Sequence, residues 1–360
     1  MIPVTKPFLP PIQDYNNYVQ GIWERNWLTN NGPLVLSLEA ELKKHLDLEN
    51  LLFVTNGTIA IQLAIKALGL KGNIITTPFS YVATTSSIVW EGCKPIFVDI
   101  DPDTFNINPS LIEKAIDSDT TAILATHCFG NACDIEAIDL IAKRNNLKVI
   151  YDAAHCFGST YNGKSIFGFG DISTASFHST KLFHSIEGGG VITSDPNLLK
   201  RMAYMRNFGH DGVEKFNGVG INGKNSEFHA AMGLCNLKYI ERIRDKRKEQ
   251  SLYYDELLTD FDAKRIVIQS KCGFNYAYYP IVFSSEEKLL KAKSALERQD
   301  ISPRRYFFPS LSHLDYVQNQ LTPVSDSVAK RILCLPLYHT LSRENQQLIA
   351  RVLMSNQNNV

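Results

Sequence analysis

Ser176-Phe177-His178-Ser179-Thr180-Lys181 places a lysine just beyond a short apolar strand, with a glycine-rich turn from Gly188 to Gly190 behind it. Upstream, the strand-like run Val149-Ile150-Tyr151-Asp152 ends in a carboxylate. From about residue 33 onward, short apolar segments alternate with segments in which apolar residues recur at helical spacing. That alternation predicts an α/β fold with a mainly parallel central sheet covered by helices on both faces.

The same periodicities give the expected elements and domains. Strands are expected at 51–54, 74–77, 95–99, 122–126, 149–152, 174–177 and 191–193, and helices at 34–46, 58–68, 81–90 and 135–144. One long helical run is expected at 226–258, with its charged stretch 241–249 as the solvated face of a helix that crosses to a second domain. The remainder, with a strand at 278–283 and a helix at 286–298, predicts a smaller C-terminal α+β domain. We therefore expect an N-terminal arm (1–32), a large domain (33–245) and a small domain (246–360).

The composition is that of an ordinary globular protein: of 360 residues, 44% are hydrophobic and 21% are charged. Lys+Arg and Asp+Glu number 37 each, so no basic field is available to attract nucleic acid or an anionic membrane. No apolar run reaches the roughly 18 residues of a membrane-spanning helix, and the N-terminus has no signal-peptide core. We expect a cytoplasmic protein without nucleic-acid or membrane partners.

The seven cysteines are odd in number and scattered, and no two of them form a CxxC pair. This pattern indicates buried, reduced thiols and neither a disulfide framework nor a zinc site. The histidines likewise show no spacing typical of metal ligands. We therefore expect no metal.

Asp152 and Lys181, about 30 residues apart and each at the end of a strand, indicate a specific chemistry. Pyridoxal 5′-phosphate (PLP) needs an amine to hold its aldehyde as a Schiff base and a carboxylate to keep its pyridine nitrogen protonated. The two residues supply both groups. The sequence therefore predicts a PLP enzyme, in which Lys181 is the catalytic residue.

Two segments are similar in sequence to known phosphate-binding loops. The run from Gly158 to Ser165 matches the Walker A pattern, but the residues that follow it are poor helix formers, and Asn162-Gly163 favours a hairpin turn. The run Gly188 to Gly190 lacks the spacing of a dinucleotide fingerprint. We expect neither ATP nor a dinucleotide to bind.

A third segment, Asn56-Gly57-Thr58, follows a strand and opens a helix, where free N–H groups and the helix dipole favour an anion. Gly57 allows close backbone approach and Thr58 adds a hydroxyl group, which suits the phosphate of PLP. The alternative is a simple N-cap at Thr58. Tyr81 starts the next helix, where it is either a core aromatic or a ring that stacks on the pyridine. His155 is either a buried core histidine or a neighbour of the cofactor's phenolic oxygen.

These residues together resemble the sugar-nucleotide aminotransferases of the DegT/StrS type, which are fold type I, aspartate-aminotransferase-like PLP enzymes. The likeness covers most of the chain. It is carried by 27–29 with Gly32-Pro33, by 56–58, 78–84, 130–134, 152–155 and 176–181, and by 187–189, 220–222 and 335–337. A smaller C-terminal domain beside the large PLP domain is what this family implies.

The resemblance also implies residue roles. Lys181 would be the Schiff-base lysine, Asp152 the partner of the pyridine nitrogen, Tyr81 the stacking ring and His155 the neighbour of its hydroxyl. Gly57, Thr58 and Ser176 would hold the phosphate. Asn222 would reach the phosphate in the neighbouring subunit, which requires a homodimer with shared active sites.

The resemblance further implies an L-glutamate donor and a nucleotide-linked keto sugar as acceptor. The sequence segments 126–131 and 178–181 are most similar to those of the dTDP-4-amino-4,6-dideoxyglucose branch. The product of that branch is used to build a surface polysaccharide such as O-antigen. Thr29 and Lys224 lie in segments that would face the substrate or the partner. Asn30-Asn31 and Lys224 depart from the usual Thr or Ser-Thr and from the usual arginine, which affects substrate detail and not reaction class.

Two alternatives stay open from the sequence. The acceptor could carry its ketone at C3 and not at C4, and a relative could bind PLP as a regulatory protein without turnover. Arg304 and Tyr306 belong to the segment 303–309, which is either a nucleotide-sugar contact or an ordinary surface loop.

Overall fold

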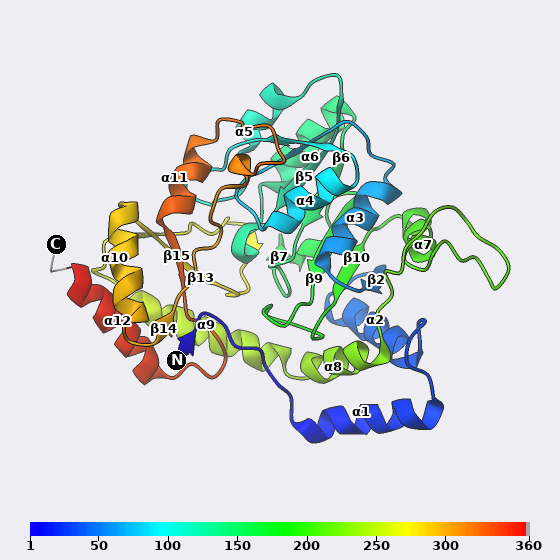
Figure 1. Cartoon of the computed structure of the whole chain (residues 1–360), viewed down its shortest axis with the longest axis horizontal. Helices are drawn as coiled ribbons and strands as arrows, with labels where there is room; N and C mark the ends of the chain where they lie inside the picture. Colours follow the sequence, from blue (N-terminus) through cyan, green and yellow to red (C-terminus); the bar gives the residue numbers. More distant parts are fainter. Residues whose placement is uncertain (358–360) are drawn as a thin grey trace.

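The structure, a computed structural model, describes residues 1–357 and is built around a seven-stranded sheet of order β2-β10-β9-β6-β5-β3-β4 (Figure 1). The strands are β2 Leu51–Val54, β3 Asn73–Thr76, β4 Lys94–Phe97, β5 Thr120–Thr126, β6 Lys148–Asp152, β9 Ile172–Ser176 and β10 Gly189–Ile192. Neighbouring strands are parallel except for β10, which is antiparallel to both β2 and β9. The expected mainly parallel α/β sheet is confirmed, with one reversed strand.

Both faces of this sheet are covered, because successive residues of its buried strands enter different apolar clusters. Ile123 and Val149 belong to a cluster that also contains residues of α2, α6 and α8. Leu124 and Ile150, one position later, belong to a second cluster with α3, α4 and α7. The helices are α1 Ile12–Arg25, α2 Pro33–His45, α3 Gly57–Ala67, α4 Val82–Trp90, α6 Ile135–Asn145, α7 Pro196–Met205 and α8 Glu227–Leu237.

The single helix expected over 226–258 is wrong, because the chain forms two helices, α8 and α9 (Ile240–Leu257). At the break, Lys238 and Tyr239 donate their N–H groups to the carbonyls three residues earlier, at 3.3 and 3.0 Å. Tyr239 has a φ of −110°, far from the helical value of about −63°. No Gly or Pro marks this break, so periodicity alone does not reveal it.

The charged stretch 241–249 lies in α9, and most of its side chains are exposed or half-buried, as expected for a solvated face. Arg247 is the exception and is only 4% exposed. Its Nη1 donates to the carbonyl of Ala277 at 2.8 Å. Burial lowers the pKa of Arg247 to about 10. One side of α9 is therefore packed against the segment that leads into the small domain.

The small domain has its own antiparallel sheet, formed by β11 (Ala263–Arg265), β13 (Tyr279–Phe283) and β15 (Ile332–Leu335). Its apolar core also contains residues of α10 (Glu286–Glu297) and α12 (Arg343–Gln357). A further helix, α11, spans Pro323–Arg331. Helices α1, α7, α11 and α12 were not expected from the periodicity.

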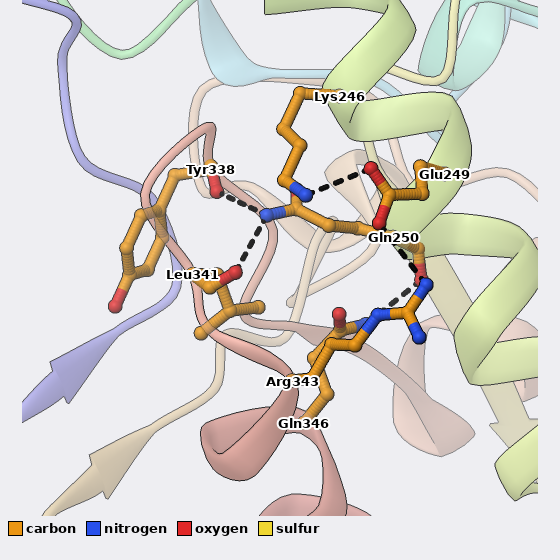
Figure 2. A network of polar contacts seen from close by, with 7 residues as sticks. All are labelled: Lys246, Glu249, Gln250, Tyr338, Leu341, Arg343 and Gln346. Carbon is orange, nitrogen blue, oxygen red and sulfur yellow. Dashed lines mark hydrogen bonds and ion pairs between the residues drawn. The ribbon is translucent and has the colours of Figure 1, made fainter.

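A buried glutamine joins α9 to the C-terminal helix of this domain (Figure 2). Gln250 donates to the backbone carbonyls of Tyr338 and Leu341, at 2.9 and 2.8 Å, and Gln346 donates back to the carbonyl of Gln250 at 2.8 Å. Glu249 bridges Lys246 and Arg343 at the exposed edge of the same network. These bonds hold α9 and α12 together.

The first residues of the chain join the small domain. The two-residue strand β1 (Ile2–Pro3) pairs in parallel with β14 (Ile301–Ser302), whereas α1 packs along α8 of the large domain (Figure 1). Helix α9 runs through residue 245 without interruption. The division into 1–32, 33–245 and 246–360 stays a prediction.

Among residues 1–357, no helix is long and apolar enough to cross a membrane. All seven cysteines are free thiols; six are buried and Cys272 is half-buried. The expectation that the cysteines are mostly buried is confirmed.

Candidate active site

A cavity of about 370 Å³ lies at the C-terminal edge of the central sheet and is closed on its other side by residues of the 278–307 region. The ends of β5, β6 and β9 contribute Thr126, Asp152 and Ser176 to its wall. Crevices at this edge of α/β sheets are where ligands bind, because the strand ends and helix N-termini meet there. The cavity therefore has the place and the size of a small-molecule site.

Lys181 lies on the return between β9 and the antiparallel strand β10. Its neighbours Leu182 and Phe183 are buried, and Phe183 stacks on Phe157 with ring centroids 4.4 Å apart. This packing holds the connection between β9 and β10 in place, and the lysine side chain lines the cavity. Burial lowers the pKa of Lys181 to about 8, although the nearby Asp152 carboxylate acts in the opposite direction.

Asp152 is 5% exposed and is held through both carboxylate oxygens. Thr84 of α4 donates its hydroxyl to Oδ2 at 2.7 Å, and the Ala154 N–H donates to Oδ1 at 3.1 Å. The Thr84 hydroxyl also contacts Ser80, which in turn contacts Thr126 at the end of β5. A chain of hydroxyl groups therefore fixes the orientation of this carboxylate at the cavity wall.

His155 lines the same cavity, and its imidazole lies beside two phenylalanine rings of nearly the same orientation. Phe129 and Phe307 lie parallel to it, at interplanar angles of 7° and 3°. Its Nδ1 accepts the backbone N–H of Phe129 at 3.2 Å. Burial, with the nearby positive charge of Lys181, holds the pKa of His155 well below its ordinary value. The ring is therefore neutral with its proton on Nε2, which makes Nε2 a donor.

The turn before α3 is pressed against two strands of the sheet. A Cβ on Gly57 would lie 3.0 Å from the Cβ of Ser176, and a Cβ on Gly189 would lie 2.5 Å from the backbone of Asn56. The N-cap of α3 is Asn56, whose side chain accepts the Ile59 N–H at 2.9 Å. The alternative of an N-cap at Thr58 is therefore wrong. The N–H groups of residues 57 and 58 open the helix at the cavity, where they suit an anion.

Tyr81 and Arg304, which are more than 200 residues apart in the chain, both line the cavity. Tyr81 precedes α4 and is 53% exposed, so it is not a core aromatic. Arg304 pairs through its backbone with Cys334 of β15, and its guanidinium lies 4.6 Å from the centre of the Tyr306 ring. Both Arg304 and Tyr306 line the cavity, which favours a substrate contact over an ordinary surface loop.

Comparison with known proteins identifies the family to which this site belongs. The sequence profile of the DegT/DnrJ/EryC1/StrS aminotransferase family matches residues 12–354. The chain belongs to this family.

Named relatives agree with the profile. A dTDP-4-amino-4,6-dideoxy-D-glucose transaminase of Shigella dysenteriae is 40% identical over 97% of both chains. A protein of the same name from Escherichia coli is 37% identical over 98% of both chains. The crystal structure of DesI in the presence of its TDP-sugar product superposes with a TM-score of 0.94 at 27% identity, covering 99% of this chain and 93% of that one. The expected class of PLP-dependent sugar-nucleotide aminotransferase, acting on small molecules, is confirmed.

The residues present fit PLP in this aminotransferase. The cavity joins an amine of lowered pKa, a buried carboxylate, the open N-terminus of α3 and an exposed aromatic ring. The residues expected from the sequence that it brings together are Gly57, Thr58, Tyr81, Asp152, His155, Ser176, Lys181, Arg304 and Tyr306. Their individual roles stay predictions.

Three expected site residues lie away from the cavity wall. Asn222 is exposed on the segment after α7, and Lys224 is buried two residues later. Thr29 is exposed between α1 and α2, and its carbonyl accepts the Trp27 indole N–H at 2.6 Å. A single copy of the chain does not bring these three residues to the site.

Other cavity residues were not expected from the sequence. Tyr278 packs its ring 4.6 Å from that of His155. His178 Nε2 lies 3.4 Å from the Glu187 carboxylate at the cavity wall. The only sequence signal for His178 was its position, two residues after the strand end and three before Lys181. No local sequence pattern marks Tyr278 as a cavity residue.

The Walker-like segment is a hairpin, as expected. Strands β7 (Thr160–Tyr161) and β8 (Lys164–Ser165) pair in antiparallel fashion, and both turn residues, Asn162 and Gly163, have positive φ, at 50° and 75°. That combination is typical of a type I′ turn. Within residues 1–357 no cluster of three or more His, Cys, Asp or Glu side chains is arranged to hold a metal ion.

Proposed function

We propose that this enzyme transfers the amino group of L-glutamate to a nucleotide-linked 4-keto-6-deoxyhexose, namely dTDP-4-keto-6-deoxyglucose. The product would be dTDP-4-amino-4,6-dideoxyglucose, used for a surface polysaccharide such as O-antigen. The observation that carries the chemistry is the placement of Lys181 and Asp152 in one cavity. The acceptor is supported by the names of the relatives at 40% and 37% identity.

Each wall of the cavity would hold one part of PLP. Gly57, Thr58 and Ser176 would bind the phosphate, Asp152 would pair with the protonated pyridine nitrogen, and Tyr81 would stack on the ring. When bound, PLP supplies the electron sink that makes the α-proton of an amino donor acidic. The Nε2–H of His155, which its bond to the Phe129 N–H leaves as a donor, would stabilise the phenolic oxygen.

Lys181 is the proposed general base and acid for proton transfer. A pKa of about 8 leaves a useful fraction of its amine neutral near pH 7, as a general base requires. With PLP bound, this amine would be the base that takes the proton from the α-carbon of the donor and the acid that returns it, and the same residue would move protons in the opposite direction when the acceptor is aminated. Asp152 stays in position throughout, because Thr84 and the Ala154 N–H hold both of its oxygens.

We further propose an obligate homodimer in the cytoplasm. Asn222 lies on a segment whose apolar residues Phe216 and Val219 are 62% and 81% exposed, which suits burial against a second copy. In that dimer, Asn222 of the partner subunit would contact the phosphate of the cofactor. The seven free thiols are the state that a reducing compartment maintains.

Absorbance spectroscopy of bound PLP tests whether the protein is an aminotransferase. Wild-type protein with PLP is expected to show a visible band that L-glutamate converts to near-ultraviolet absorption, and Lys181→Ala is expected to lack the lysine-bound band. Restoration of the band by one keto sugar identifies the acceptor. If only a 3-keto sugar restores it, the 4-keto assignment is overturned. If PLP binds and glutamate has no effect, the protein is the regulatory alternative.

Mixed dimers test the shared site. Lys181→Ala and Asn222→Ala homodimers are each expected to be nearly inactive, but a hybrid dimer contains one site with both residues intact. Random pairing of the two variants should restore about a quarter of wild-type activity, since half of the dimers are hybrids with one working site each. Mixing Lys181→Ala with the double variant provides the control, and equal activity in both mixtures would exclude the shared site.

A further inference from the structure

The segment 206–224 leaves the large domain after α7, projects from the body and returns to α8 (Figure 1). The outer part of this segment is exposed, whereas its two ends, near Arg206 and Gly223 (the base of the segment), are held by backbone hydrogen bonds. The Gly223 N–H donates to the carbonyl of Arg206 at 2.9 Å, and the Gly223 carbonyl accepts the Thr55 N–H at 3.0 Å. Thr55 stands directly before the proposed phosphate-binding turn. The base of the segment therefore has a fixed position relative to this subunit's own cavity.

Lys224, at this base, is only 8% exposed as a residue, and the hydrogen bond of its ammonium group is partly buried. Its Nζ donates to Oδ1 of Asn222 at 2.8 Å and lies 4.6 Å from the centre of the Phe208 ring. Among the described residues no carboxylate pairs with it. Burial lowers the pKa of Lys224, and the nearby Arg206 acts in the same direction. Its polar contact is thus directed at a single exposed asparagine.

This contact dictates how Asn222 presents its amide. An ammonium group has three donors and no acceptor, so the side that faces Lys224 must be the amide oxygen. The NH₂ group of Asn222 is then directed away from the lysine, and the residue is exposed. Two N–H donors on an exposed side chain suit the oxygen atoms of an anion.

We propose that Lys224 is a positioning residue that locks the Asn222 amide with its NH₂ group outward, so that it donates to the cofactor phosphate held by the partner subunit. This inference rests on the proposed shared active site. It differs from the expectation that Lys224 itself faces substrate, because the side-chain hydrogen bond that the structure gives its ammonium group is to Asn222. The cation and its cation–π contact with Phe208 fix the geometry, and the amide carries the contact.

The test compares affinities for PLP and for pyridoxal, which lacks the phosphate. Apoprotein of wild type, Lys224→Met, Lys224→Arg, Asn222→Ala and the Lys224→Met/Asn222→Ala double variant is titrated with each compound, and light scattering verifies the dimer in every case. Lys224→Met is expected to weaken PLP roughly tenfold, in the range of one hydrogen bond to a charged group. Lys224→Arg should stay within about twofold, since arginine also offers only donors. Pyridoxal affinity should not change.

The double variant separates positioning from direct contact. If Lys224 acts through the amide, Lys224→Met has no further effect once Asn222 is alanine. An additional loss of PLP affinity in that background would show that Lys224 contacts the phosphate itself and would overturn the inference. Equal weakening of PLP and pyridoxal would reduce Lys224 to a structural role, which also overturns it. If Asn222→Ala leaves PLP affinity unchanged while wild type binds PLP well, the shared site fails and this inference fails with it, whereas PLP binding by the enzyme stands.

Discussion

The lowered pKa of Lys181 predicts an unusually reactive amine even before cofactor binds. With a pKa of about 8 in place of 10.5, roughly 9% of Lys181 side chains are neutral at pH 7, against roughly 0.03% for an unperturbed lysine. The expected gain in neutral amine is therefore on the order of 300-fold. Because the shift favours the neutral form, reactivity should rise with pH through a midpoint near 8 and level off above it.

Competitive acetylation measures this titration directly. Apoprotein is exposed to trace acetic anhydride at a series of pH values, and the acetylation of Lys181 is followed by peptide mass spectrometry, with the exposed Lys44 as an internal reference for the reagent. Two variants test the cause of the shift. Arg304→Gln removes a positive charge and should raise the midpoint, whereas Asp152→Asn removes the opposing carboxylate and should lower it.

A midpoint near 10.5 for wild type would refute the argument that burial controls this amine. A midpoint near 8 that moves in the wrong direction in both charge variants would keep the lowered pKa but refute its electrostatic explanation. Circular dichroism and light scattering of each variant verify that the fold and assembly are intact.

Three further substitutions probe the supports of the site. Thr84→Val removes the hydroxyl that donates to Asp152, and should lower kcat/KM about tenfold in steady-state kinetics, since a bond to a charged group is lost; unchanged kinetics would exclude an orienting role. Glu39→Ala leaves the buried Arg206 guanidinium unpaired and should cost about 3–5 kcal/mol of unfolding free energy in urea, whereas a cost below about 1 kcal/mol would show that the pair is dispensable. Gly189→Ala would place a Cβ 2.5 Å from the turn before α3, and should weaken PLP but not pyridoxal binding about tenfold in a fluorescence titration.

The sheet and the two central residues of the site could be predicted from the sequence, because local patterns report both. Asp152 ends an apolar run that is buried in the structure, and Lys181 follows shortly after another, so their chemistry and their placement near the ends of strands are visible together. Asn56-Gly57-Thr58 shows its strand-to-helix context in the same way, although the capping residue is Asn56. Each of these features depends on a few consecutive residues.

What could not be predicted depends on contacts between distant segments. β10 lies between β9 and β2, and its pairing with β2, more than 130 residues earlier in the chain, has no local signal in the sequence. Tyr278 reaches the cavity because the small domain packs there, and no local pattern marks it. The contact between Lys224 and Asn222 joins residues only two positions apart, yet residue spacing alone does not show which way the amide of Asn222 is turned.

The residues predicted to carry out the reaction and the residues predicted to select the acceptor come from different parts of the fold. The ends of three adjacent strands, β9, β6 and β5, deliver Ser176, Asp152 and Thr126, and the outer two of these strands stand about 10 Å apart. A flat cofactor can therefore span rigid strand ends that tolerate little change. Arg304 and Tyr306, predicted from the sequence as acceptor contacts, line the same cavity from a segment outside that sheet. Reaction class is therefore predicted to depend on the sheet that carries Lys181 and Asp152, and acceptor preference on the segments outside it.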